Sequence, residues 1–256
     1  MRLGGEAASS GPSFCVIIPM YNEAAGAARC VREVCSILTG LPERTGLIVV
    51  EDGSDDCTKQ ILQQLAESEP KLEVVVHARN MGYGTALRTG VEHAVQTGYD
   101  YALFMDSDLT NDPRDIPRFV AKMKGGVDVI KASRYIRGGG MLGVPLHRVL
   151  ISRLGNSIAR LLFGIGVRDC TNGFRAVRLD ILARMHLQEN GFAVIVEELY
   201  QSKFLASTYA EVPTTLTNRR TEIRSTSFTY KPSIFLKYLK YGIKARLSIR
   251  PKKERT

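Results

Sequence analysis

The sequence predicts an α/β fold in which a mostly parallel central sheet carries helices on both faces. Three observations support this prediction. Apolar runs of strand length alternate with segments of helical spacing from residue 14 to about residue 131. A chain of 256 residues, 44% of them hydrophobic, is long enough to bury one large core. Polar clusters directly follow three of the expected strands, where parallel sheets bind their ligands.

The expected strands are apolar runs bounded by turn-forming or polar residues. The run over residues 14–19 ends at Pro19, and residues 46–51 form a second buried run before an acidic cluster. The same pattern predicts further strands, in chain order, at 72–77, 101–105, 127–131 and 208–213.

The expected helices lie between and after these strands. In residues 24–38 the apolar residues recur at helical spacing, and Asp55 or Asp56 can cap the next helix. Asp112 with Pro113 is a typical start of another helix. The predicted helices are 24–38, about 57–68, 82–96, a segment from 113, 146–163, 179–186 and 194–206.

Composition divides the chain into three expected segments. Residues 1–13 are small and polar and predict a disordered tail, without the apolar core of a signal peptide. Residues 14–230 form the expected domain. Residues 231–256 hold nine Lys or Arg and one Glu, a net +8 out of +9 for the whole chain. The basic character is therefore confined to a tail. No apolar run approaches the roughly 20 residues of a membrane span.

The cysteines indicate a reducing compartment. There are five, an odd number, and no C-x-x-C pair occurs. A disulfide framework or a zinc site is therefore not expected, and a cytosolic location fits better.

The sharpest chemical feature is Asp106-Ser107-Asp108, directly after the expected strand 101–105. Carboxylate oxygens are the ligands that Mg²⁺ and Mn²⁺ prefer, and such ions often complete their shell with substrate phosphates. A cation that bridges a diphosphate neutralises charge as a nucleotide departs. The alternative for two such carboxylates taken alone is a solvated acidic turn or a helix cap.

Two further clusters are expected at the same edge of the sheet. Asp52 can accept hydrogen bonds from a nucleobase or ribose, although the acidic cluster also suits a helix cap. Tyr21 can stack on a base while its two successors bond the edge of that base. Gly82 precedes a helix, where a bare backbone can approach a phosphate. The spacings of a Walker loop and of G-x-G-x-x-G are absent, which argues against an ATPase or a dinucleotide enzyme.

Together these pieces resemble glycosyltransferase family 2 and, within it, the dolichol- and polyprenyl-phosphate sugar synthases. Order and spacing agree from about residue 14 to about 228. The segments that carry the resemblance are IIPMYNE (17–23), VVEDGSDD (49–56), RNMGYGTALRTG (79–90), MDSDLTNDP (105–113), ASRY (132–135), ISRLGN (151–156), DCTNGFRAVR (169–178) and EVP (211–213).

The resemblance implies a GT-A fold with a Rossmann-like sheet and an inverting hexosyltransferase. The donor would be GDP-mannose or UDP-glucose, and the acceptor a polyprenyl or dolichyl phosphate. Asp106 and Asp108 would hold a divalent metal, Mg²⁺ or Mn²⁺. The nucleoside pocket would be lined by Pro19, Tyr21, Asn22, Glu23 and Asp52.

The resemblance also implies how the phosphates and the sugar are held. Arg134 and Arg153, with Ser152 beside them, would hold the phosphate of the lipid acceptor. Arg219 or Arg220 with Arg224 would clamp the donor diphosphate. Phe174, Arg175 and the stretch 169–173 before them would lie beside the donor sugar. The sequence departs from the usual family pattern at three places: Glu51, Thr110 and the clamp segment 218–225, which lacks a lysine.

The acceptor decides whether a general base is needed. A phosphate is ionised at neutral pH, whereas a neutral hydroxyl usually requires a base. Glu197 and Glu198 form the one late acidic pair in the sequence and are the candidates for a saccharide or other hydroxyl acceptor. A nucleotidyltransferase and a non-catalytic nucleotide-sugar binding module are further alternatives.

The basic tail predicts contact with a membrane. Lys237, Lys240 and Lys244 share one helical face, with apolar and aromatic residues elsewhere. Such a helix suits the headgroups of an anionic membrane, so we expect a peripheral protein on the cytosolic face. A terminal helix docked on the core is the alternative, and no nucleic-acid-binding motif accompanies the charge. Many members of the family continue into membrane spans and this sequence does not, so a membrane-spanning partner subunit is a further expectation.

Overall fold

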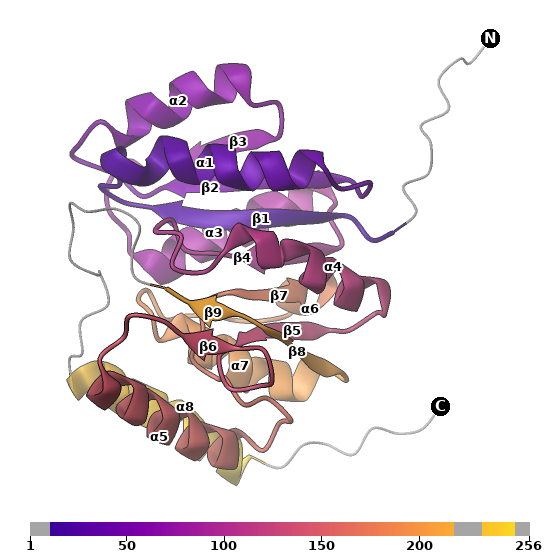
Figure 1. The fold of residues 1–256 in the computed structure, drawn as a ribbon, viewed down its shortest axis with the longest axis vertical. Coiled ribbons are helices and arrows are strands. Elements are labelled where there is room, and N and C mark those ends of the chain that lie inside the picture. The colour runs from indigo at the N-terminus through magenta and orange to yellow at the C-terminus, as the bar shows by residue number, and fades with distance from the viewer. Residues whose placement is uncertain (1–10, 218–231, 249–256) are drawn as a thin grey trace.

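The structure, a computed structural model, describes residues 11–217 and 232–248. Among these residues a seven-stranded sheet has the order β3-β2-β1-β4-β7-β5-β8 (Figure 1). A second, two-stranded sheet pairs β6 with β9. The strands are β1 Phe14–Met20, β2 Thr45–Glu51, β3 Leu72–Val76, β4 Tyr101–Phe104, β5 Val129–Ser133, β6 Gly140–Met141, β7 Arg175–Arg178, β8 Tyr209–Pro213 and β9 Thr215–Leu216.

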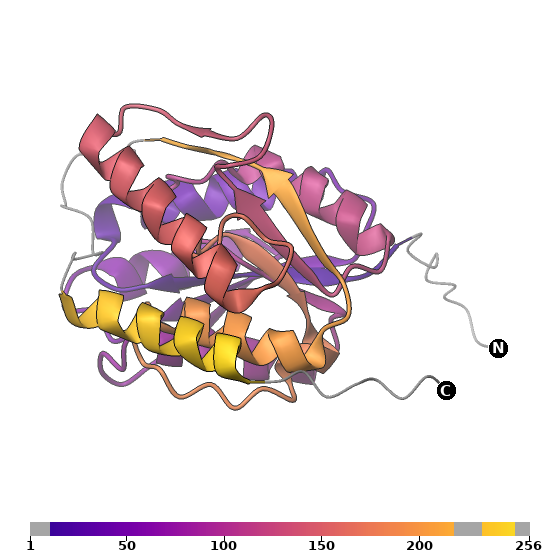
Figure 2. The same cartoon turned by 90° about the horizontal axis from the view of Figure 1, so that it is seen from below.

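Helices cover both faces of the large sheet, as the alternating sequence pattern predicts (Figures 1 and 2). Strands β1 to β4 are parallel, and the order 3-2-1-4 places a switch point between β1 and β4. Ligands bind at the carboxyl ends of strands beside such a point. The helices are α1 Ala24–Thr39, α2 Thr58–Ser68, α3 Tyr83–Thr97, the short 3₁₀ helix η1 Pro113–Asp115, α4 Ile116–Lys124, α5 Leu146–Phe163, α6 Leu179–Leu182, α7 Val194–Leu205 and α8 Pro232–Leu247.

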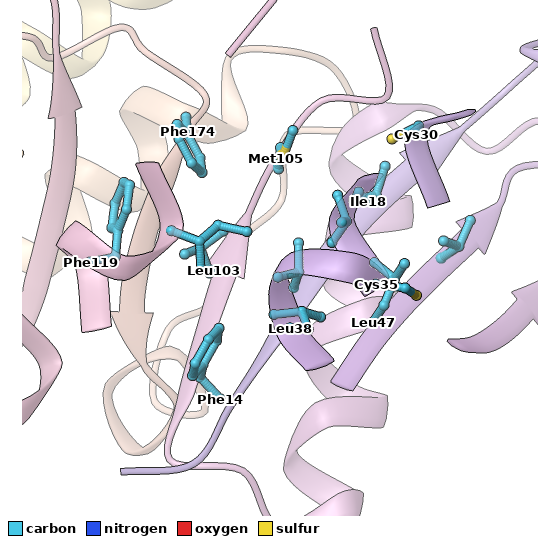
Figure 3. Close-up of a cluster of buried hydrophobic side chains, with 14 of the residues drawn as sticks. Phe14, Ile18, Cys30, Cys35, Leu38, Leu47, Leu103, Met105, Phe119 and Phe174 are labelled. Atoms are coloured by element: carbon cyan, nitrogen blue, oxygen red, sulfur yellow. The ribbon is translucent and has the colours of Figure 1, made fainter. Parts of the chain in front are cut away.

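The two-residue period of the strands divides the core into two layers. Phe14 and Ile18 of β1 face the layer that also contains α1 and α4, whereas Ile17 faces the layer of α3, α6 and α7. Figure 3 shows the first layer, in which Phe119 of α4 lies beside Phe174, with ring centroids 4.7 Å apart. Burying each such side chain contributes about 1.5–3 kcal/mol, which fixes the sheet and its strand ends.

The strand β7 is a feature that the sequence analysis did not predict. It runs antiparallel to both of its neighbours, β4 and β5. Its sequence, RAVR, has a charge at each end and therefore lacks the apolar run that marks a buried strand. Arg175 is nevertheless buried, because its guanidinium pairs with Glu198 on α7. The helix expected over 179–186 ends after one turn, at Leu182.

Both predicted tails contact the domain where the structure describes them. Residues 1–10 lie outside the described residues, but Ser13, placed in the disordered tail, is held by hydrogen bonds to Asp100. At the other end, α8 packs against the domain through the buried residues Tyr241 and Ala245. Helix α5 lies beside α8 (Figure 2). A Cβ at Gly242 would lie 2.8 Å from the Leu162 side chain, so the glycine lets the two helices approach. Within the described part of the chain, no helix combines the length and the hydrophobicity that crossing a bilayer requires.

Candidate active site

The loops after β1 and β2 are joined by hydrogen bonds at the carboxyl edge of the sheet. Asn22 receives the Asp55 backbone amide on its Oδ1 at 2.8 Å, and its own amide donates to Ser54 Oγ at 2.9 Å. Asn22 adopts φ 54°, a left-handed conformation that Asn tolerates better than most residues. The Tyr21 hydroxyl donates to Asp55 Oδ2 at 3.2 Å. The two predicted clusters therefore meet, as the parallel strand order requires.

Asp52 connects the end of β2 to the start of α3. Its Oδ1 lies 2.6 Å from His77 Nδ1 and accepts from the Met81 amide at 2.9 Å. Its Oδ2 accepts from the Gly82 amide, also at 2.9 Å. The side chain is almost fully buried, and hydrogen bonds to a buried carboxylate are stronger than bonds between neutral groups. Asp52 therefore anchors segment 77–82, and its direct contact with a nucleoside stays a prediction.

A cavity of about 450 Å³ opens at this edge, a volume typical of small-ligand sites. Of the five predicted nucleoside residues, Tyr21 lines this cavity and the other four are not among its lining residues. Lys59 and Arg79 bring positive charge that the sequence analysis did not assign to the site. The residues that line the cavity are Tyr21, Glu51, Gly53, Ser54, Asp55, Lys59, Val76, His77, Ala78, Arg79 and Asn80.

The two carboxylates of the D-x-D motif lie at the end of β4 and are partly exposed. The Tyr83 hydroxyl donates to Asp106 Oδ1 at 3.0 Å. Burial, and then the adjacent Asp106, raise the pKa of Tyr83 well above its ordinary value, so the hydroxyl keeps its proton at neutral pH. Asp108 Oδ1 accepts from the amide and the hydroxyl of Thr110, at 3.0 and 2.9 Å. The Thr110 hydroxyl is therefore already engaged by the motif itself.

Asp52 and Asp106 lie on the same edge, linked through consecutive residues. Gly82 bonds to Asp52, and its neighbour Tyr83 bonds to Asp106. No group of three or more His, Cys, Asp or Glu poised for a metal occurs within residues 11–217 and 232–248. The motif thus offers two carboxylates to a cation, and the remaining ligands would come from elsewhere.

The glycines before α3 have a structural reason beyond the predicted phosphate contact. Gly82 adopts φ 93°, and a Cβ there would lie 2.6 Å from the Asn190 carbonyl oxygen. The amide of Gly84 donates to that same carbonyl at 2.7 Å. Segment 188–192 therefore lies against the first turn of α3. Phosphate binding by Gly82 stays a prediction.

A family model decides the affiliation of the chain. The model described as Glycosyl transferase family 2 matches residues 15–185, more than half of the sequence. The chain belongs to glycosyl transferase family 2. It is therefore a glycosyltransferase, and the predicted family is confirmed.

Two relatives of this family 2 glycosyltransferase are named as enzymes of polyprenol- or dolichol-phosphate mannose synthesis. Polyprenol monophosphomannose synthase of Mycolicibacterium smegmatis is 29% identical over 240 residues, which cover 91% of this chain and 88% of that protein. Dolichol-phosphate mannosyltransferase of Pyrococcus furiosus is 31% identical over 202 residues, covering 78% of this chain and 55% of that protein.

A solved structure confirms the predicted GT-A fold. Glucosyl-3-phosphoglycerate synthase from Mycobacterium tuberculosis, in complex with Mn²⁺, uridine diphosphate and phosphoglyceric acid, superimposes with a TM-score of 0.68. It is 21% identical and covers 97% of this chain and 82% of its own.

In this family 2 glycosyltransferase the predicted acceptor residues lie close to one another. Arg134 donates through Nε and Nη2 to Asp169, at 2.7 and 2.8 Å. Burial by itself raises the pKa of Asp169, but the Arg134 guanidinium outweighs burial and holds that pKa below its ordinary value. The hydroxyl of Tyr135 lies 2.7 Å from Ser152 Oγ on α5, and the next residue of that helix, Arg153, is exposed. A phosphate contact for Arg134 and Arg153 stays a prediction.

The acidic pair on α7 is engaged in structural contacts. Glu198 receives two hydrogen bonds from Arg175, each at 2.6 Å, and both side chains are buried. Glu197 accepts the backbone amides of Gln188 and Glu189 at 2.8–3.0 Å. Phe174 and Arg175 are both buried, and their expected contact with the donor sugar stays a prediction. The predicted clamp residues Arg219, Arg220 and Arg224 lie outside the described residues.

Lys131 gives a pH-dependent test of this buried network. Its amine donates to the Asn172 carbonyl at 2.6 Å. Burial, and then the nearby Arg175, lower the pKa of Lys131 from 10.5 to about 8. Between these two values the unfolded chain binds more protons than the folded one, so the stability contributed by Lys131 rises with pH.

We therefore expect the free energy of unfolding of wild type, relative to Lys131→Met, to increase by roughly 2 kcal/mol from pH 7.5 to 9.5. Urea denaturation at both pH values measures this difference. Lys122→Met, which removes an exposed amine from α4, is the matched control. A wild-type advantage that stays constant or falls over this range would contradict the assignment.

Proposed function

We propose that this glycosyltransferase moves a hexose, in the first place mannose, from a nucleotide sugar to a polyprenyl phosphate at a membrane surface. The observation that carries the proposal is that Asp52 and Asp106 share one edge of the sheet, linked through Gly82 and Tyr83. The ligand-sized cavity opens at that edge. The acceptor and the sugar are supported by the names of the Mycolicibacterium and Pyrococcus relatives, the first of which aligns along most of both chains.

The D-x-D residues fit a hard divalent cation, Mg²⁺ or Mn²⁺. Both side chains present carboxylate oxygens and are partly exposed. Gly173 leaves room beside them, since a Cβ at that position would lie 3.2 Å from Asp106 Oδ2. A bound cation would supply neutralisation of the negative charge on the leaving diphosphate. The Mn²⁺ and uridine diphosphate in the solved Mycobacterium tuberculosis synthase support this role.

The chemistry that we propose is a single inverting displacement. An oxygen of the acceptor phosphate attacks the anomeric carbon, and the bond from that carbon to the diphosphate oxygen breaks. The acceptor is already ionised, so no protein base is required. Consistent with this, Glu197 and Glu198 are tied to backbone amides and to Arg175, which disfavours a hydroxyl acceptor activated by either residue.

The residues of the chain then act by orientation. Arg134, fixed by Asp169, holds a positive charge in place without reorganisation on substrate binding. Tyr83 keeps the Asp106 carboxylate oriented. Lys59 and Arg79, on the wall of the cavity, provide positive charge for the donor phosphates.

A surface formed by α5 and α8 supports the lipid acceptor. Both helices carry exposed apolar side chains at helical spacing, and neither contains an acidic residue. Soluble proteins rarely leave large apolar patches uncovered. We call this set the apolar stripe: Leu146, Leu150, Leu154, Ile158 and Leu161 of α5, with Leu236, Leu239, Ile243 and Leu247 of α8.

Basic residues accompany the apolar stripe, and they suit an anionic bilayer. Arg148, Arg153 and Arg160 are exposed on α5, and Lys240 and Lys244 on α8. Apolar contacts and positive charge act together at lipid headgroups. We therefore propose a peripheral location on the cytosolic face of a membrane. Lipid contact by α5 adds to the predicted role of the basic tail.

Replacing Asp108 with Ala tests the proposed chemistry. We expect sugar transfer to fall by at least about 100-fold, because the leaving diphosphate loses electrostatic stabilisation. The assay follows radiolabelled mannose from GDP-mannose, and glucose from UDP-glucose, into a short polyprenyl phosphate with Mn²⁺ or Mg²⁺. Circular dichroism should show an unchanged fold. Undiminished transfer by the variant would exclude the metal role of this residue.

A pair of substitutions tests the lipid surface. Leu150→Ser with Leu154→Ser should weaken binding to vesicles of phosphatidylcholine and phosphatidylserine by at least about tenfold, since buried leucines each contribute about 1.5–3 kcal/mol. Val95→Ser, an exposed position on α3, is the matched control. Flotation of protein with vesicles measures both. If wild type binds no vesicle, the stripe instead belongs to a protein partner, such as a membrane-spanning subunit, and the lipid proposal fails.

A further inference from the structure

Helix α8 is attached to a short segment that leads to the active site. The Tyr241 hydroxyl, almost fully buried, lies within hydrogen-bond distance of two carboxylates, Glu189 Oε1 at 3.3 Å and Glu197 Oε1 at 3.1 Å. Lys237, one helical turn earlier, pairs with Glu189 Oε2 at 2.6 Å. Glu197 in turn accepts the amides of residues 188 and 189. Helix α8 therefore holds the first half of segment 188–192.

The second half of this segment touches the residue that bonds to the D-x-D motif. Phe192 stacks on Tyr83, with ring centroids 4.6 Å apart and ring planes at 30°. The Tyr238 hydroxyl of α8 donates to the Phe192 carbonyl at 3.4 Å. On the opposite side, the Tyr83 hydroxyl donates to Asp106 Oδ1. A continuous path of contacts thus runs from α8 to a carboxylate of the motif.

The segment is also fixed to α3, so it has little freedom to move alone. Gly84 donates its amide to the Asn190 carbonyl, and Arg88 donates to the Glu189 carbonyl at 2.9 Å and to Asn190 Oδ1 at 2.7 Å. These contacts hold segment 188–192 between α8 and the first turn of α3. A change on α8 therefore reaches Tyr83 through packed groups and hydrogen bonds.

The hydroxyl of Tyr83 forms a hydrogen bond with the carboxylate of Asp106. It donates to Oδ1 at 3.0 Å, and a Cβ at Gly173 would lie 3.2 Å from Oδ2 and 3.4 Å from the Tyr83 hydroxyl, so only a glycine leaves both groups undisturbed. Groups that bond to a metal-binding carboxylate orient it, and their loss typically weakens metal binding 10–100-fold.

We propose that Tyr83 positions the Asp106 carboxylate for the divalent cation, and that α8 holds Tyr83 in place through segment 188–192. The inference rests on the proposed function, because it assumes that Asp106 binds the cation. It adds that a helix on the lipid-facing side and the metal site form one connected unit. Tyr83 is a positioning residue, and it takes no part in bond making.

The first test removes one oxygen atom. Tyr83→Phe keeps the ring and its stacking on Phe192 but loses the hydrogen bond to Asp106. We expect Mn²⁺, titrated alone and with GDP into the full chain, to bind at least about tenfold more weakly by electron paramagnetic resonance. Tyr101→Phe is the matched control, since its hydroxyl donates to the Val127 carbonyl at the opposite end of β4. Thermal unfolding verifies that both variants fold.

The second test distinguishes the contacts that connect α8 to Tyr83 from the overall positive charge of α8. Lys237→Met and Arg246→Met each remove one positive charge from α8, but only Lys237 pairs with Glu189. Both should lose vesicle affinity equally, whereas only Lys237→Met, and more strongly Tyr241→Phe, should weaken Mn²⁺ binding several-fold. Hydrogen exchange at residues 188–192 should quicken in the same two variants.

The outcomes distinguish the two proposals. Wild type that binds no Mn²⁺ would overturn the proposed metal function and this inference with it. Wild type that binds Mn²⁺ no better than Tyr83→Phe would overturn the positioning role and leave the proposed function intact. If Tyr83→Phe binds Mn²⁺ weakly while Tyr241→Phe binds it as tightly as wild type, the role assigned to α8 is overturned.

Discussion

The buried carboxylate of Asp52 is the constraint on which the arrangement of the site depends. It gathers His77, Met81 and Gly82 at the end of β2, and so fixes the point at which α3 begins. A buried carboxylate is costly unless it is hydrogen-bonded, and here the three donors compensate that cost. Because Gly82 is held there, the next residue, Tyr83, reaches Asp106 on the neighbouring side of the switch point.

A second set of buried charged groups stabilises the elements that surround the site. Arg175 pairs with Glu198, Arg134 with Asp169, and the Lys131 amine bonds to the carbonyl of Asn172. Breaking one partner of a buried pair costs about 3–5 kcal/mol, so these contacts hold β7 against α7 and the end of β5 against segment 169–172. The late glutamates belong to this scaffold. With both glutamates held by protein groups, the site suits the proposed acceptor, which is already ionised.

Much of the fold follows from the sequence, because most strands are uniformly apolar and most helices show a clear period. The predicted bounds of β1, α1 and α5 agree with the structure to within a residue or two. Strand β7 escaped prediction because its ends are charged, and only the tertiary pairing of Arg175 explains its burial. Helix α6 is short because the chain turns away to form the segment that rests on α3.

The site was predictable in outline and less so in detail. The D-x-D motif and the clusters after β1 and β2 all follow strands that end at one edge of the sheet, as the parallel order predicts. The sequence could not show that the Asp52 carboxylate accepts hydrogen bonds from the protein itself. That contact depends on how close the fold brings residues 77–82. Nor could it show Tyr83 beside Asp106, because the contact joins separate strand ends. Lys59 and Arg79 lie next to the motifs in the sequence, and their positive charge could have indicated that they belong to the site.

The most direct measurement is calorimetric titration of the purified chain with GDP-mannose and with UDP-glucose, each with and without Mn²⁺. If the cavity and the D-x-D motif form one site, one of these donors binds when Mn²⁺ is present and binds far more weakly without it. Absence of binding by both donors in the presence of the metal, or an affinity indifferent to it, would contradict a single site built from the ends of β1, β2 and β4.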